Sequence, residues 1–339
     1  MKLNDYFKVF NSNISLNPTR DDKIESAFET WKANFKENEK LKEIFNEFYA
    51  QGSYATGTAI RPQNSNEFDV DSILVLDLED SKKPKETLTF IANVLKSYEA
   101  YKDKITVKDR CVRINYAGDF HMDIVPAKPT DEEYVLIACK SEDEWKETNP
   151  VGFKNWFIEK NAEASYKLSP VTRAIKHWRD YSVGKDTAPK SILLTTLIAK
   201  HINGCNSIAK SIVLTLESLV DDIDDILDKD GEPFVENPSL EKENLARDWS
   251  KSKFDIFKKK LSKFASDSRA ALDEKDSDKS IKMWRNIFGN KFPDELPEEA
   301  DSSENIKNGN ILVNSSGMLN NVEGTKILEH RFFGGYIDE

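Results

Sequence analysis

Three aspartates are the residues of this chain whose type and spacing could do chemistry. Asp69 and Asp71 stand two residues apart at the start of an apolar run over 72–76, and this run predicts a buried strand. Side chains alternate along a strand, so both carboxylates point to the same face. Two negative charges this close to an apolar core repel each other. A cation, a basic side chain or solvent must therefore compensate them.

The third aspartate, Asp123, lies in a second predicted strand, 120–125. Alternation places Asp123 and His121 on the face opposite to Met122. If this strand lies beside the first, three carboxylates converge at one edge of a sheet. Magnesium prefers such oxygen ligands, and two magnesium ions about 3.5–4 Å apart promote in-line phosphoryl transfer. The aspartates therefore predict a site for two Mg²⁺ ions.

A possible anion-binding turn precedes the aspartate pair. Gly52-Ser53 follows an apolar stretch and offers backbone N–H groups and a hydroxyl, and a helix beginning there would add its dipole. Gly57-Thr58 provides a second tight point. A phosphate-binding turn followed by a carboxylate pair suits a nucleoside triphosphate with magnesium.

The periodicity of apolar residues predicts the elements that position these groups. The predicted strands are 67–78, two strands within 105–129 around a turn at Ala117-Gly118-Asp119, and 133–138. The predicted helices of this part are 22–48 and 84–101. From about residue 150 the pattern is almost entirely helical, with predicted helices at 150–163, 169–182, 189–202, 206–228, 240–264 and 267–288.

The bulk composition disfavours several protein classes. The chain has 339 residues, of which 38% are hydrophobic and 32% charged, enough for a core in two domains. Its net charge of −11 argues against general binding to long nucleic acids. No apolar run approaches the roughly 18–20 residues of a membrane span. Three scattered cysteines without metal-ligand spacing indicate reduced thiols. We therefore expect a cytoplasmic protein that binds neither membranes nor zinc.

Three segments together carry a family resemblance. The order "GSYATGTAI", "FDVD" and "HMDIVPA" resembles the signature of the polymerase β-type nucleotidyltransferase superfamily. Within it, the chain resembles the bacterial cGAS/DncV-like nucleotidyltransferases (CD-NTases), which are related to oligoadenylate synthetase and cyclic GMP-AMP synthase. The stretches "GTAIRP", "IVPA" and "MWRNIFGNKFP" support this narrower resemblance. It spans most of residues 20–295.

The resemblance implies an α+β fold. A polymerase β-like nucleotidyltransferase core, a mixed sheet with flanking helices, would be followed by a C-terminal helical domain, with the two lobes around a deep cleft. Residues 1–165 would form the catalytic core with an N-terminal spine helix. Residues 166–295 would form a helical domain of the oligoadenylate-synthetase type, and residues 296–339 a polar tail whose C-terminus docks onto the body.

The resemblance also assigns roles to the aspartates and to the glycine turn. Asp69 and Asp71 would bind both Mg²⁺ ions, for which Mn²⁺ could substitute. Asp123 would bind the ion that activates the acceptor hydroxyl. Gly52 and Ser53 would hold the terminal phosphates of the donor nucleotide.

Helical residues would complete the nucleotide site. Lys176 stands where the family has a lysine that reaches the donor triphosphate. A second position, at the start of a later helix, contacts phosphate or ribose in the family. In this chain it corresponds to Lys190 or Ser191, and the sequence does not choose between them.

The function implied is the condensation of nucleoside triphosphates, with ATP among them, into a cyclic di- or trinucleotide with release of pyrophosphate. Bacterial relatives serve antiphage defence signalling, so activation by a regulatory protein partner is an expectation, beside constitutive activity. Linear oligonucleotide synthesis and nucleotidyl transfer to an RNA or protein acceptor are alternatives. A non-catalytic interaction scaffold is a more distant one, because all three aspartates are present.

Overall fold

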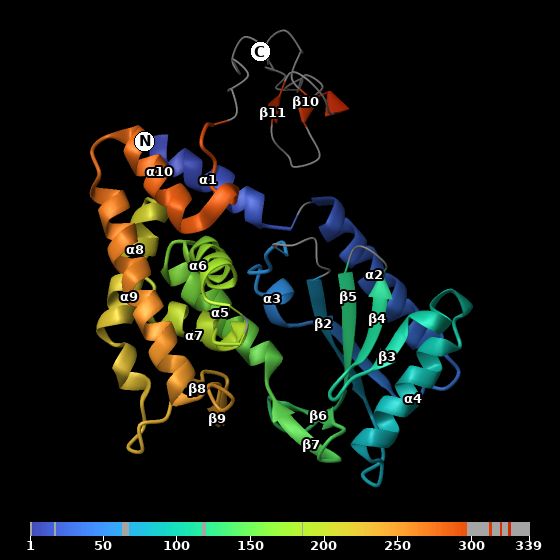
Figure 1. Ribbon diagram of the computed structural model, residues 1–339. Helices are drawn as coiled ribbons and strands as arrows, with labels where there is room; N and C mark the ends of the chain where they lie inside the picture. Colours follow the sequence, from blue (N-terminus) through green and yellow to red (C-terminus); the bar gives the residue numbers. More distant parts are fainter. Residues whose placement is uncertain are drawn as a thin grey trace, which may run out of the picture.

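The computed structural model describes most of the chain as one body of two lobes (Figure 1). It describes residues 2–16, 18–62, 68–116, 120–184 and 186–296, together with three short strands further along the chain. These are β10 (Leu312–Val313), β11 (Leu319–Asn320) and β12 (Thr325–Lys326), which pair with one another.

A mixed seven-stranded sheet forms the first lobe, and its main path runs β1-β2-β5-β4-β3, with β6 and β7 continuing from the end of β5. The parallel pair is β2 with β5, and the other pairs are antiparallel. The strands are β1 (Phe45–Ala50), β2 (Phe68–Leu76), β3 (Ile105–Val107), β4 (Val112–Tyr116), β5 (Phe120–Lys128), β6 (Val135–Cys139) and β7 (Glu144–Thr148). The predicted mixed sheet is confirmed.

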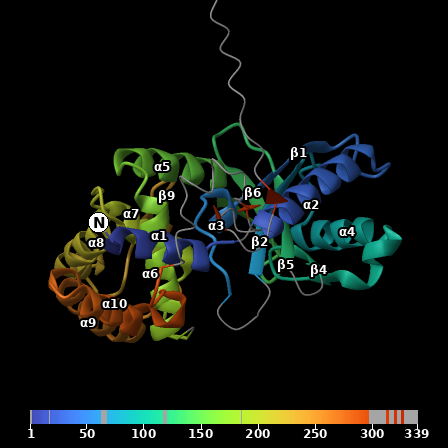
Figure 2. The same cartoon turned by 90° about the horizontal axis from the view of Figure 1, so that it is seen from above.

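Two helices cover one face of this sheet. Helices α2 (Pro18–Glu37) and α4 (Pro84–Lys96) lie on the side away from the second lobe (Figures 1 and 2). Trp31 of α2 and Ile91 of α4 are buried in the same cluster as Met122 of β5. Burial of these large side chains against the strands stabilises the sheet and leaves its opposite face turned toward the second lobe. A short 3-10 helix, η1 (Glu99–Lys104), follows α4.

The second lobe is helical and has its own core. Its helices are α1 (Lys2–Ile14), α5 (Pro150–Glu163), α6 (Leu168–Ser182), α7 (Ser191–His201), α8 (Ile208–Asp221), α9 (Lys251–Asp273) and α10 (Ser277–Phe288). Two 3-10 helices, η2 (Ile223–Ile226) and η3 (Gly289–Lys291), and a hairpin of β8 (Glu236–Asn237) and β9 (Leu240–Asn244) complete it. Among the described residues, no helix is both long and apolar enough to cross a membrane.

The N-terminal helix α1 packs with the second lobe, although it precedes the sheet in sequence. Phe7 and Phe10 are fully buried, and the ring of Phe7 meets the edge of Trp284 with centroids 4.8 Å apart. Sequence periodicity did not predict this helix. The segment 1–165, taken as one catalytic domain, therefore contributes to both cores, and its boundaries stay a prediction.

Several predicted elements differ from the observed ones. The predicted helix 22–48 ends at Glu37, and its last residues form β1 instead. Phe45 and Phe48 have helical spacing, but pairing of Phe48 with Leu74 of β2 overrides this local pattern. In the same way, residues 240–244 of a predicted helix form β9. The predicted turn at 117–119 and the docking of the last residues lie outside the described part of the chain.

Candidate active site

The three predicted aspartates come together on the sheet face that is turned toward the helical lobe. In the parallel pairing of β2 and β5, Asp71 stands opposite Asp123, and Asp69 stands opposite His121. The intervening Val70 and Met122 point into the core. The Ser72 hydroxyl donates a 3.0 Å hydrogen bond to the Asp123 carbonyl oxygen. The register of two adjacent strands therefore holds the three carboxylates side by side.

A basic side chain compensates two of these carboxylates. Arg113 of β4 stands opposite Asp123 in the antiparallel pairing of β4 and β5. Its Nε and Nη2 atoms donate hydrogen bonds of 2.7 and 2.8 Å to the two carboxylate oxygens of Asp123. Nη2 also lies 2.8 Å from Oδ1 of Asp69. Of the three compensations left open by the sequence, the structure shows the basic side chain.

The third carboxylate, Asp71, has an altered ionisation. Burial, together with the charges of Asp123 and Asp69, raises its pKa to about 6, against the opposing effect of Arg113 and Lys176. The hydrogen bond to Asp123 raises the pKa of Arg113, so the guanidinium stays charged. The site therefore carries three carboxylates against one fixed positive charge.

The donor atoms of this site suit a hard divalent cation. All three acidic side chains offer oxygen atoms, which Mg²⁺ and Mn²⁺ prefer and which Zn²⁺ structural sites rarely use alone. Within the described part of the chain, no three His, Cys, Asp or Glu side chains form a ready-made metal cluster. The contacts of Arg113 with Asp69 and Asp123 occupy part of the space that such an ion would need.

Gly52 begins a one-turn helix, α3 (Gly52–Ala55), beside the carboxylates. Its φ of +65° is in the left-handed region, and a Cβ atom there would lie 2.8 Å from Oδ2 of Asp71. The backbone N–H of Gln51 donates to the Asp71 carbonyl oxygen at 2.9 Å, which ties this turn to β2. Because α3 is so short, individual N–H groups and the Ser53 hydroxyl, rather than a helix dipole, are available to an anion.

Lys176 extends from α6 toward the same turn. It is only 3% exposed, and its Nζ donates a 2.8 Å hydrogen bond to the Thr58 carbonyl oxygen. Burial lowers its pKa to about 7, and the neighbouring positive charge of Arg179 contributes. The amine is therefore held close to the glycine turn, and a negatively charged ligand would favour its protonated form.

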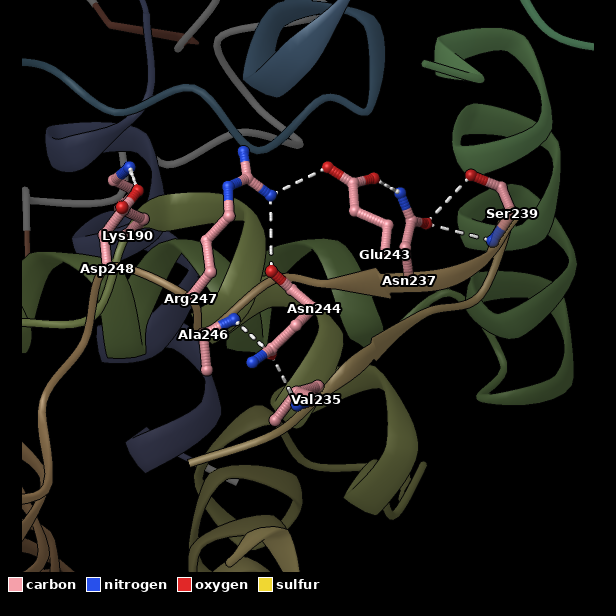
Figure 3. Close-up of polar contacts among 9 residues, drawn as sticks. All are labelled: Lys190, Val235, Asn237, Ser239, Glu243, Asn244, Ala246, Arg247 and Asp248. Atoms are coloured by element: carbon pink, nitrogen blue, oxygen red, sulfur yellow. Dashed lines mark hydrogen bonds and ion pairs between the residues drawn. The ribbon is translucent and has the colours of Figure 1, made fainter. Parts of the chain in front are cut away.

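Lys190 and Ser191 lie at the start of α7, on the same wall. The Lys190 ammonium forms an ion pair with Asp248 (Figure 3). The Ser191 hydroxyl accepts a 3.0 Å hydrogen bond from Nη1 of Arg179. Both residues line the cavity described next, so their position does not decide between them.

A cavity of about 830 Å³ lies between the lobes and unites these groups. Every predicted site residue except the buried Asp123 lines it. Sequence analysis missed four further cationic side chains in its wall, which are Arg61, Arg110, Lys154 and Arg179. Two signals could have found some of them, because Arg179 lies one helical turn after Lys176 and Arg61 belongs to "GTAIRP". The cavity is rich in positive charge in a chain of net charge −11.

The β8–β9 hairpin contributes Asn237 to the wall of the cavity, and polar contacts hold this residue in place (Figure 3). Asn237 lines the cavity, and its Oδ1 accepts hydrogen bonds from the N–H and the hydroxyl of Ser239. Its Nδ2 donates to Glu243 at 2.6 Å. The Ser239 hydroxyl also donates to the carbonyl of Asn149, the residue that caps α5. These contacts fix the hairpin to the segment that connects the two lobes.

Known nucleotide synthases resemble this chain over most of its length. The family model of the Second Messenger Oligonucleotide or Dinucleotide Synthetase domain matches residues 1–161. The "Cyclic AMP-AMP-AMP synthase" of Acinetobacter sp. (strain ATCC 27244 / 9458) is 28% identical over 300 residues, covering 87% of each chain. The "c-di-GMP synthase" of Roseivirga ehrenbergii is 30% identical over 265 residues, covering 69% of each chain.

The chain is a CD-NTase.

Solved structures of other CD-NTases share the fold. The Bradyrhizobium diazoefficiens CD-NTase CdnG in complex with GTP superposes with a TM-score of 0.71 at 18% identity, covering 85% of this chain and 95% of that one. The Escherichia coli MS115-1 CdnC:HORMA-deltaN complex gives a TM-score of 0.70 at 16% identity, covering 86% and 98%. These likenesses confirm the α+β fold with its C-terminal helical region.

Membership in the family establishes the enzyme class. This CD-NTase is a nucleotidyltransferase that makes cyclic di- or trinucleotide second messengers from nucleoside triphosphates. Divalent metals are typical of such nucleotidyltransferases. The scaffold alternative is thereby set aside, and the linear-product and macromolecular-acceptor alternatives have no support from these relatives.

Proposed function

We propose that the cavity between the lobes is the active site, with Asp69, Asp71 and Asp123 as ligands of two Mg²⁺ ions, for which Mn²⁺ can substitute. The observation that supports this most directly is the strand register that sets Asp71 beside Asp123 on the cavity side of the sheet. Bound divalent ions would neutralise the triphosphate and lower the pKa of the attacking ribose hydroxyl. The all-oxygen donor set fits that chemistry.

We propose further that the donor triphosphate binds between the glycine turn and the start of α7. The N–H groups at Gly52 and the Ser53 hydroxyl would hold its terminal phosphates from the sheet side. Lys176, and Lys190 or Ser191, would hold them from the helical side. A ligand contacted from both lobes is oriented for in-line attack, and the lobes exclude water from the reacting phosphorus.

The substrates we propose are purine nucleoside triphosphates, with ATP among them. The names of the two curated relatives contain AMP and GMP units, respectively. We also propose a regulatory protein partner, because the E. coli CdnC structure is a complex with HORMA-deltaN. The role of the product in antiphage defence and the cytoplasmic location stay predictions from the resemblance.

A product assay tests the proposed site. Purified protein is incubated with four labelled nucleoside triphosphates and Mg²⁺, and the mixture is then treated with phosphatase. A phosphatase-resistant product should form with the wild type and disappear when ATP is omitted. Asp71→Asn should abolish it, because one ligand of the site loses its charge. Asp77→Asn is the matched control, since Asp77 is exposed beyond the far end of β2.

Retention of product by Asp71→Asn would contradict the assignment of the carboxylates. A product that phosphatase degrades completely would instead show linear synthesis at the same site. Absence of any product, with Mg²⁺ or with Mn²⁺, would direct the search to the regulatory partner. Repeating the assay with that partner added would then decide whether it is required.

A further inference from the structure

Arg113 lies in the carboxylate site but has no role in the mechanism proposed for the enzyme. It comes from the strand next to Asp123 and contacts two of the three carboxylates. A bidentate guanidinium–carboxylate pair is among the strongest and most directional polar contacts in proteins. Its position therefore calls for an explanation that includes the metal site.

The two contacts of Arg113 are not equivalent. The Asp123 side chain is 10% exposed and receives two hydrogen bonds from the guanidinium. The Asp69 side chain is 54% exposed and has a single contact, from Nη2 to Oδ1. An ion arriving from the cavity can therefore reach Asp69 easily, whereas the pair with Asp123 is sheltered and held by the β4–β5 register.

The charges point the same way. Three ionised carboxylates and one guanidinium leave a net charge of −2, which one divalent cation neutralises. Without Arg113, three negative charges would face one another at the edge of the apolar sheet core, and their repulsion would push the side chains apart. With Arg113, the site keeps its shape before any ion arrives, but an incoming ion must compete for Asp69.

We propose that Arg113 is a positioning residue that acts as an internal counter-cation of the metal site. It holds Asp69 and Asp123 in place in the metal-free protein, and it releases Asp69 to the ion while it stays paired with Asp123. Arg113 thus weakens metal binding in the absence of nucleotide and protects the metal-free enzyme from repulsion among its carboxylates. This inference rests on the proposed metal site.

Metal binding without turnover tests the proposal. Mn²⁺ is titrated into nucleotide-free protein, and free Mn²⁺ is followed by electron paramagnetic resonance. Arg113→Gln should bind Mn²⁺ about tenfold more tightly than the wild type, because the ion no longer displaces a charged hydrogen bond. Its melting temperature should be lower than that of the wild type without metal, and its increase on addition of Mn²⁺ should be larger. Arg113→Lys keeps the positive charge but not the bidentate guanidinium, so its Mn²⁺ affinity and melting temperature should lie between those of the wild type and Arg113→Gln.

Two controls separate the possible failures. Arg269→Gln removes another bidentate arginine pair, with Glu217 of α8, and should leave Mn²⁺ affinity unchanged. Asp71→Asn should abolish the Mn²⁺ binding seen at this site. If Asp71→Asn binds Mn²⁺ normally, the proposed metal site itself is wrong. If Asp71→Asn loses binding but Arg113→Gln and Arg113→Lys both bind Mn²⁺ as weakly as the wild type or more weakly, the counter-cation role is overturned.

Discussion

Lys176 offers a sharp test of the proposed triphosphate site, because its ionisation in the free protein differs from that of an ordinary lysine. Its pKa is lowered to about 7 by burial and by the charge of Arg179. A bound triphosphate would place several negative charges beside the amine and favour its charged form. Nucleotide binding should therefore take up protons from solution.

The size of this uptake follows from the fraction of Lys176 that is neutral before the nucleotide arrives. With a pKa of about 7, that fraction is about 0.1 at pH 6, about 0.5 at pH 7 and about 0.9 at pH 8. The dissociation constant should rise about tenfold per pH unit above 8, where Lys176 of the free protein is neutral. Asp71, with a pKa of about 6, is almost fully ionised at pH 8 and contributes little there.

Isothermal titration calorimetry measures the uptake directly. A non-hydrolysable ATP analogue with Mg²⁺ is titrated at each pH in two buffers of different ionisation enthalpy, and the difference in heat gives the number of protons. Lys176→Met should show no uptake and about 10- to 150-fold weaker binding at pH 7, through loss of a charged hydrogen bond to phosphate. Lys200→Met, at an exposed position of α7, is the matched control.

Thermal unfolding provides an independent check on the same pKa. The lysine pKa is 10.5 in the unfolded chain and about 7 in the folded one, so the unfolded state binds more protons between these values. The free energy of unfolding should therefore rise with pH across this window. Below pH 7 the buried amine is charged in the folded protein, and the free energy of unfolding is lowered by the full cost of charging it there. Lys176→Met should raise it at pH 6 by up to about 5 kcal/mol.

Either of two results would refute the reasoning. Wild-type protein that takes up no protons at pH 8 would show that Lys176 is already charged without nucleotide. Unchanged affinity in Lys176→Met would show that this amine does not contact the triphosphate, whatever its pKa.

Three further predictions concern other parts of the site. At low Mg²⁺ the rate of product formation should decline as pH falls through about 6, because Asp71 becomes protonated. Added Mg²⁺ should restore the rate by competing with the proton, and a decline that Mg²⁺ does not reverse would argue against Asp71 as a metal ligand. Gly52→Ala should lower kcat/KM about 100-fold, because its Cβ would displace the Asp71 carboxylate. Gly57 has the same left-handed backbone but open space around it, so Gly57→Ala should retain activity, and equal losses in the two variants would trace the effect to the backbone alone. Lys190→Gln should raise the KM for ATP about tenfold with little change in kcat, whereas Asp248→Asn, which removes the partner of Lys190, should not raise the KM. A normal KM in Lys190→Gln would leave Ser191 as the residue that contacts the nucleotide.

Alternation along strands made much of the site predictable from local sequence. Asp69 and Asp71 share a face because side chains alternate with a period of two, and the same rule assigned the face of Asp123. Apart from α1, the helices of the second lobe were recognisable because their apolar residues recur with helical period over ten or more residues. The order of the glycine turn, the aspartate pair and the third aspartate indicated the superfamily, and the stretches "GTAIRP", "IVPA" and "MWRNIFGNKFP" narrowed the resemblance to the CD-NTases.

Some elements were not predictable, because their conformation or position depends on the partner they meet. The strand β1 has helical spacing of its aromatic residues, and only its pairing with β2 makes it extended. The strand β9 lies where a helix was predicted, and hydrogen bonds of Ser239 with Asn149 hold its hairpin in place. Helix α1 precedes the sheet in sequence, but its phenylalanines find their apolar partners in the helical lobe.

The sequence by itself therefore determined which candidate site residues the chain offers and on which face of each strand the aspartates lie, since both follow from short-range periodicity and from the order of motifs. The tertiary structure decided what surrounds them. Arg113 is compensated by Asp69 and Asp123 only through the register of three neighbouring strands. Lys176 meets the Thr58 carbonyl only because α6 lies beside the segment 57–58. Charge compensation and burial depend on distances between residues far apart in the chain, and local sequence patterns do not contain those distances.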